Sequence, residues 1–199
     1  MGHHKKNQLT LIPANGKFQF NHGGILRQQR RGRKQRPLSS REPLHLVFKA
    51  RRYVIKESSF RGRRSYMLCH AIIRKYSVKF FVKIEQVSIQ GDHIHLLVRC
   101  SRRTHYQSFF RVVAGQIAQS FQKHGLLKSV TDTPNKPATH RKLWMYRPFT
   151  RVVRSFRALK ILRDYIQLNE QEALGLINYN VRRLAGLNSS EWQMLWGSG

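Results

Sequence analysis

Acidic side chains are scarce in this chain of 199 residues, where 9 Asp and Glu stand against 38 Lys and Arg. A chain with a formal net charge of +29 repels itself unless counter-charge is near. The composition therefore favours a polyanionic partner, above all nucleic acid. Charge alone does not distinguish a DNA-processing enzyme from a ribosomal or histone-like protein.

Cysteine and long apolar runs are also scarce. The two cysteines, Cys69 and Cys100, are too few for a zinc ribbon or a disulfide framework and fit free thiols in a reducing cytosol. No stretch reaches the roughly 18 uninterrupted apolar residues of a membrane span. The first residues contain no apolar segment typical of a signal peptide. We therefore expect a cytoplasmic protein without a membrane partner.

The N-terminal part differs in composition from the rest of the chain. Residues 1–42 contain no acidic residue before Glu42 and end in a basic run without an apolar period. We expect them to form a flexible arm that binds the DNA backbone. Its DNA-binding side chains are predicted to be Arg30, Arg31, Arg33, Lys34 and Arg36. A catalytic domain over 43–180 and a tail over 181–199 complete the expected organisation.

Regular patterns begin at Pro43. Strand-like patterns cover 44–55, 79–90, 93–100 and 143–155, and helical patterns cover 65–76, 103–124 and 155–175. Ser65 and Ser155 are predicted N-caps, and Gly91-Asp92 a two-residue hairpin turn with Gly91 at positive φ. The element order predicts an α+β fold, a ferredoxin-like split βαβ antiparallel sheet with an extra C-terminal catalytic helix. Its two crossover helices cover one face of the sheet and leave the other open.

The stretch "HIHLLV" places two imidazoles side by side. Side chains at i and i+2 of a strand share a face, so His93 and His95 lie together, opposite the apolar stripe that begins at Ile94. An isolated pair of this kind is more often just polar surface, and a metal site needs a third ligand. We expect both rings to project from the open face, where a final helix or a ligand can reach them. Burial of both beneath helices would exclude metal binding.

The last helix supplies further candidates. Its docking stripe is predicted to be Phe156, Leu159, Leu162 and Ile166. Tyr165 and Asn169, four residues apart, lie together on the flank of that stripe. Two imidazoles and an amide oxygen suit Mg²⁺ or Mn²⁺ polarising a phosphate, and a tyrosine beside such a metal is a candidate nucleophile. Tyr179 is a rival nucleophile, and Gln167 a rival amide that points about 200° away from Tyr165.

The order of "HIH" on a strand, a long amphipathic helix and "YIQLN" on a later helix resembles the single-tyrosine HUH transposases of the insertion-sequence 200/605 type. The asparagine four residues after the tyrosine is similar to their repetitive-extragenic-palindrome-associated branch. The resemblance covers roughly residues 43–180. It implies that His93 and His95 bind the metal, that Tyr165 is the nucleophile, and that Asn169 is the third ligand. Many members of that branch have proline after the asparagine, where this chain has Glu170, which leaves the orientation of Asn169 open.

The resemblance also implies an activity and partners. Family members cut single-stranded DNA beside hairpins, form a 5′-phosphotyrosine link and rejoin strands without ATP, using Mg²⁺ or Mn²⁺. It implies a nucleoid-associated bacterial protein that works as a monomer or a homodimer. Two alternatives remain open. One is a non-catalytic basic protein with the sheet of an RNA-recognition module, and the other is an inactivated transposase that still binds hairpins.

Overall fold

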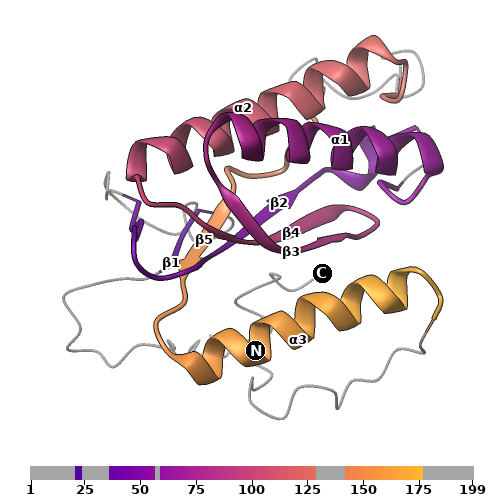
Figure 1. Ribbon diagram of the computed structural model, residues 1–199. Coiled ribbons are helices and arrows are strands. Elements are labelled where there is room, and N and C mark those ends of the chain that lie inside the picture. The colour runs from indigo at the N-terminus through magenta and orange to yellow at the C-terminus, as the bar shows by residue number, and fades with distance from the viewer. Residues whose placement is uncertain (1–20, 24–35, 57–58, 129–141, 177–199) are drawn as a thin grey trace, which may run out of the picture.

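A five-stranded antiparallel sheet lies between two layers of helices in the computed structural model, which describes residues 21–23, 36–56, 59–128 and 142–176 (Figure 1). The strands are β1 (Asn21–His22), β2 (Leu44–Lys49), β3 (Lys83–Ile89), β4 (His93–Arg99) and β5 (Phe149–Val152). The helices are α1 (Arg63–Lys79), α2 (Arg103–Lys123) and α3 (Phe156–Ala173), with a short 3-10 turn, η2 (Arg52–Val54). None of these described helices is long and apolar enough to cross a bilayer.

The strand order confirms the predicted fold class. The sheet runs β1-β5-β2-β4-β3, and its last four strands have the ferredoxin-like split βαβ order. Helices α1 and α2, the two crossovers, lie together on one face, while α3 lies on the other (Figure 1). The sequence patterns did not predict β1, which pairs with β5.

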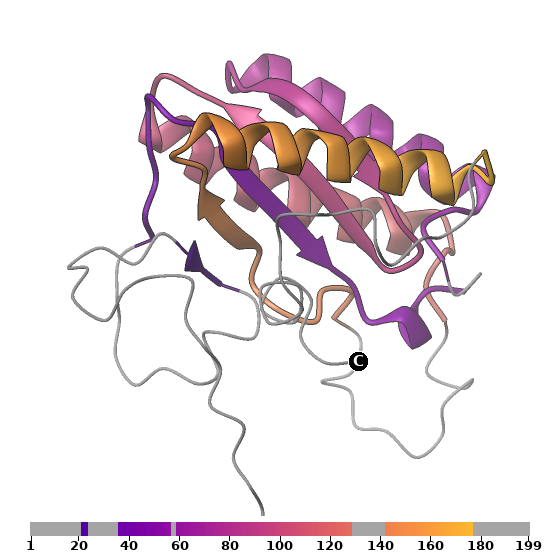
Figure 2. The same ribbon diagram turned by 90° about the horizontal axis from the view of Figure 1, so that it is seen from below.

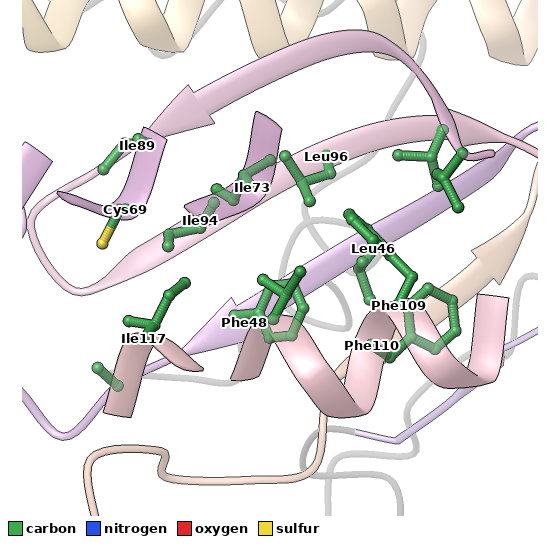
Figure 3. Packing of buried hydrophobic residues seen from close by; sticks show 14 of the residues in the cluster. Leu46, Phe48, Cys69, Ile73, Ile89, Ile94, Leu96, Phe109, Phe110 and Ile117 are labelled. Carbon is green, nitrogen blue, oxygen red and sulfur yellow. The ribbon is translucent and has the colours of Figure 1, made fainter. Parts of the chain in front are cut away.

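The main core lies between the sheet and the two crossover helices (Figure 3). Alternate residues of β2 and β4, among them Leu46, Phe48, Ile94 and Leu96, point into it. The helical spacing of apolar residues in α2 predicts one continuous stripe, and every member of it is buried: Tyr106, Phe109, Phe110, Val113, Ile117 and Phe121. Burial of each such side chain is worth about 1.5–3 kcal/mol, so this layer holds β4 in place from one side.

Two local predictions were wrong. Helix α1 begins at Arg63 with Gly62 as its N-cap, and Ser65 is buried inside the first turn instead of capping it. The hairpin between β3 and β4 does have the predicted two-residue loop, closed by the Gln90 amide, which donates to the His93 carbonyl at 2.8 Å. However, Gly91 is not among the described glycines with positive φ. The turn therefore does not need the conformational freedom of glycine.

The folded domain extends to the N-terminal side of the expected boundary at Pro43. Strand β1 lies within the range expected to be an arm, and Leu38 belongs to the main core. The Arg36 guanidinium donates to the Pro148 carbonyl at 2.8 Å and to the Thr150 hydroxyl at 3.0 Å. It also lies 5.5 Å from the ring centre of Phe110. Residues 36–42 thus pack on the domain.

Candidate active site

Helix α3 covers the sheet face that the crossover helices leave open (Figure 2). A second apolar cluster joins it to the sheet and consists of Leu97, Val153, Leu162, Tyr165 and Ile166. The predicted docking role holds for Leu162 and Ile166, but Phe156 is 81% exposed. As the first residue of α3, Phe156 lies outside this cluster, so its periodic position does not bury it. Tyr165 is only 6% exposed and belongs to the docked face instead of its flank.

The structure brings His93, His95 and Tyr165 together from β4 and α3. The two imidazoles share a face, with ring centres 4.9 Å apart and planes nearly perpendicular. The ring centre of Tyr165 lies 5.7 Å from that of His95, edge to face. His95 is fully buried beneath α3, whereas the His93 side chain is 21% exposed. The face is therefore less open than expected, although only one of the two histidines is buried.

The Nδ1 atom of each histidine on β4 contacts another side chain. His93 Nδ1 lies 2.6 Å from Asp92 Oδ1, and this hydrogen bond holds the pKa of the Asp92 carboxyl below its usual range. His95 Nδ1 lies 3.1 Å from Nε2 of His45, on the neighbouring strand β2. Metal-binding histidines typically have such a partner on the second ring nitrogen, which orients the ring. Any metal here would meet the Nε2 atom of each ring.

His45 also lies at this site, although the sequence patterns did not predict it. Its ring is nearly parallel to that of His95, with centres 5.4 Å apart and planes inclined by 8°. The signal in the sequence was the polar residue in "LHLVF", where Leu44 and Leu46 point to the main core and His45 to the opposite face. Strand alternation alone predicts that face, but not which residue of another strand lies beside it.

Burial sets the protonation state of this pair. Desolvation lowers the pKa of His45 to about 3, and it lowers that of His95 well below the usual value. Both imidazoles are therefore neutral at pH 7. The neutral form is the one that binds metal ions.

The end of α3 is fastened to the sheet beside the β3–β4 hairpin. Gln90 donates through Nε2 to the backbone oxygen of Asn169 at 2.9 Å. The Glu170 carboxylate accepts hydrogen bonds from the Ile89 amide at 3.0 Å and from Arg61 at 2.9 Å. Glu170 thus anchors the turn of α3 that carries Asn169.

The rival candidates and most of the predicted DNA-binding residues are either exposed or outside the described residues. Gln167 is exposed on α3. Tyr179, Arg30, Arg31, Arg33 and Lys34 lie outside the described residues. In the part of the chain that the structure describes, no three His, Cys, Asp or Glu side chains are grouped to hold a metal ion. A cation at His93 and His95 would therefore need another kind of third ligand, and Asn169 is one turn of helix beyond Tyr165.

Comparison with known proteins assigns the family. The family model described as IS200-like transposase matches residues 41–169. The chain belongs to this family of transposases. A comparison with curated protein sequences gave no match.

Solved structures match this chain, and the first shares its fold. One is a REP-associated tyrosine transposase bound to a REP hairpin, with a TM-score of 0.53 and 15% identity over 74% of this chain and 76% of that one. A second is a putative transposase from Deinococcus radiodurans, with a TM-score of 0.41 and 15% identity over 70% of this chain and 98% of that one.

Proposed function

We propose that this transposase cuts and rejoins single-stranded DNA through a covalent link between Tyr165 and a 5′ phosphate. The observation that carries the proposal is the position of Tyr165, whose ring centre lies 5.7 Å from that of His95 in the histidine pair. A phenol with a pKa near 10 attacks poorly at neutral pH, so its activation depends on groups at the phosphate. His93 and His95 would hold a divalent metal ion that acts on the phosphate.

The reaction exchanges one phosphodiester for another. The Tyr165 oxygen bonds to phosphorus as its proton leaves, and the bond from phosphorus to the 3′ oxygen breaks, so that a 3′-hydroxyl is released after taking a proton. A 3′-hydroxyl of the same or another strand then attacks the phosphotyrosine and restores the free phenol. The phosphotyrosine retains the energy of the broken bond, so no nucleotide cofactor is required.

Mg²⁺ or Mn²⁺ fits this site. The ion would be held by Nε2 of His93, Nε2 of His95 and the side-chain oxygen of Asn169. Because the Nδ1 atom of each histidine contacts another side chain, Nε2 is the ring nitrogen that would face the ion. When bound, the ion withdraws negative charge from the phosphate oxygens. Two imidazoles with one amide oxygen leave further positions for phosphate or water.

The proposed substrate is single-stranded DNA with hairpin elements. The support is the net charge of +29 and the fold shared with a transposase that was solved with a hairpin. Helix α3, which carries Tyr165, packs through a buried apolar cluster on the sheet of its own chain, which supports a site assembled within one copy. A homodimer stays a prediction.

One observation favours an alternative, a hairpin-binding transposase that no longer cleaves. Tyr165 and His95 are almost completely buried, so DNA reaches them only if α3 shifts from the sheet. An inactive descendant would keep the fold, the charge and this closed arrangement. Covalent capture separates the two functions, since only the enzyme leaves DNA on a tyrosine.

The test uses hairpin single-stranded DNA, labelled at its 3′ end, with Mn²⁺. The wild-type protein is expected to retain the label in denaturing gels, because the 5′ end of the labelled fragment becomes attached to Tyr165. Tyr165→Phe removes one oxygen and should lose both adduct and cleavage, with thermal unfolding unchanged. Tyr179→Phe is the matched control and should retain both. An adduct mapped to Tyr179, or cleavage by Tyr165→Phe, contradicts the assignment.

A further inference from the structure

A hydrogen bond joins the buried rings of His45 and His95, and the proton of this bond can belong to either ring. In the first, His95 donates from Nδ1 to Nε2 of His45, and Nε2 of the neutral His95 ring carries a lone pair. In the second, His45 donates from Nε2, and the proton of His95 stands on its own Nε2. Only the first arrangement lets His95 bind a cation through Nε2.

The second ring nitrogen of His45 does not select either arrangement through a hydrogen bond. This nitrogen, Nδ1, is buried and has no hydrogen-bond partner among the described residues. One nitrogen of His45 therefore lacks a partner whichever way the proton lies. The ring of Phe149 also lies beside that of His45, edge to face, with ring centres 6.3 Å apart. A phenyl ring offers no hydrogen bond to the nitrogens of His45. A buried polar group with an unmet nitrogen is costly, and replacing it by an apolar residue would remove that cost. This favours a functional reason for His45.

We propose that His45 is a positioning residue for the metal site. Its Nε2 atom accepts a hydrogen bond from Nδ1 of His95, and this bond presents Nε2 of His95 to the cation. The inference rests on the proposed function, since it assumes that His95 binds a divalent ion. Binding of the ion selects the first proton arrangement. The ring planes are inclined by only 8°, as an in-plane hydrogen bond between Nε2 of His45 and Nδ1 of His95 requires, so this bond also orients the plane of His95.

The experiment measures Mn²⁺ binding to the full chain without DNA, by calorimetry and by the electron paramagnetic resonance of free Mn²⁺. The variants differ in what they place opposite His95. His45→Leu keeps an apolar side chain without an acceptor. His45→Gln reaches the position of Nε2 with an amide oxygen, and His45→Asn is polar but too short to reach it. Phe149→Leu alters the packing around His45 and leaves the hydrogen bond.

We expect His45→Leu and His45→Asn to bind Mn²⁺ about 10- to 100-fold more weakly, the usual effect of losing such a partner. His45→Gln should restore most of the affinity, and Phe149→Leu should stay within about 2-fold of wild type. If His45→Leu fails to fold, the comparison of Gln with Asn decides. In the wild type, the ¹⁵N shifts of the His95 ring should move to the form protonated on Nδ1 when Mg²⁺ is added, which a purely structural role does not produce.

The outcomes separate the two hypotheses. If wild type binds Mn²⁺ through His93 and His95 and the three His45 variants bind equally well, the positioning role is overturned and the metal site stands. An equal loss in Phe149→Leu also overturns it, because packing alone then explains the effect. If wild type binds Mn²⁺ no better than His93→Ala, the metal site itself is overturned, and the role of His45 with it.

Discussion

Two neutral imidazoles, His45 and His95, are buried side by side in a chain with a net charge of +29. Because burial holds the pKa of each below its value in the unfolded chain, protonation favours unfolding. The stability they allow is complete above the unfolded pKa of 6.5 and falls as the pH drops toward the folded pKa, which is about 3 for His45. The same neutrality suits metal binding.

This pair predicts a pH dependence of the metal-free protein. Between pH 6.5 and 5, each histidine is expected to cost about 1.4 kcal/mol of unfolding free energy per pH unit. Urea unfolding at pH 7, 6 and 5 measures the change. His45→Gln removes one titrating group, so its stability should fall less steeply than that of wild type. Equal slopes for the two proteins would show that His45 is not buried and neutral.

At the scale of the element, α3 is held at both ends by different means. Its first turn is capped by Ser155, as predicted, since the hydroxyl accepts a hydrogen bond from the Ala158 amide at 3.1 Å. Its last turns depend on Glu170, which accepts from the backbone amide of Ile89 on the edge strand β3 and also pairs with Arg61 from the segment before α1. These contacts of Glu170 hold the part of α3 that carries the neighbouring residue Asn169.

Glu170→Ala is expected to loosen this end of α3 and to destabilise the protein by roughly 2 kcal/mol, because a hydrogen-bonded charge is removed and the Ile89 amide loses its acceptor. Hydrogen exchange should show faster exchange of the Ile89 amide. The rate of DNA cleavage should decrease, because Asn169, a proposed metal ligand, is no longer held in position. Asp164→Ala, which removes the same charge from an exposed position of α3, is the control. Equal effects of the two changes contradict a specific fastening.

Across the whole molecule, Tyr165 and His95 meet through the packing of α3 on the sheet of its own chain. The contacts of α3 with its own sheet include a buried apolar cluster as well as the Glu170 fastening. Each copy should therefore carry its own complete site.

Mixing two inactive variants tests this arrangement. Tyr165→Phe lacks the nucleophile, and His95→Ala lacks a proposed metal ligand. Because each copy combines its own β4 and α3, an equimolar mixture is expected to remain inactive on hairpin DNA. Cleavage by the mixture would show instead that α3 of one copy completes the site of another, as in a dimer with exchanged helices.

The basic segment ahead of Pro43 is predicted to bind the DNA backbone. Because Arg36 also contacts Pro148 and Thr150 within the domain, the test replaces the other four predicted residues, Arg30, Arg31, Arg33 and Lys34. Replacing these four by Gln should weaken binding to all single-stranded DNA similarly. The slope of log affinity against log salt should become shallower by about 0.7 for each phosphate that the segment no longer neutralises.

A control with the same change in net charge distinguishes direct binding by the segment from the effect of charge. It replaces four exposed basic residues of α1 by Gln: Arg63, Arg64, Arg74 and Lys79. The slope should change less in this control. Equal slopes for the two variants would mean that the N-terminal segment contributes only through net charge.

Local periodicity was sufficient for much of this protein. Alternation along β4 predicts that His93 and His95 share a face, and the spacing of α2 predicts all of its buried residues. The order of elements predicts the antiparallel sheet, and the motifs HIH and YIQLN carry the resemblance to the family that the family model confirms. These features depend on the geometry of one strand or helix, which neighbouring residues determine by themselves.

Tertiary structure alone decided which side chains meet across the fold. Residues 45 and 95 lie 50 positions apart, and only the pairing of β2 with β4 makes them partners. Glu170 meets Ile89 only because α3 crosses the sheet, and the same placement buries Tyr165 while Phe156 stays exposed. A repeating pattern specifies the face on which a side chain lies. The residue that occupies the space opposite is specified by packing between elements, where sequence distance carries no information.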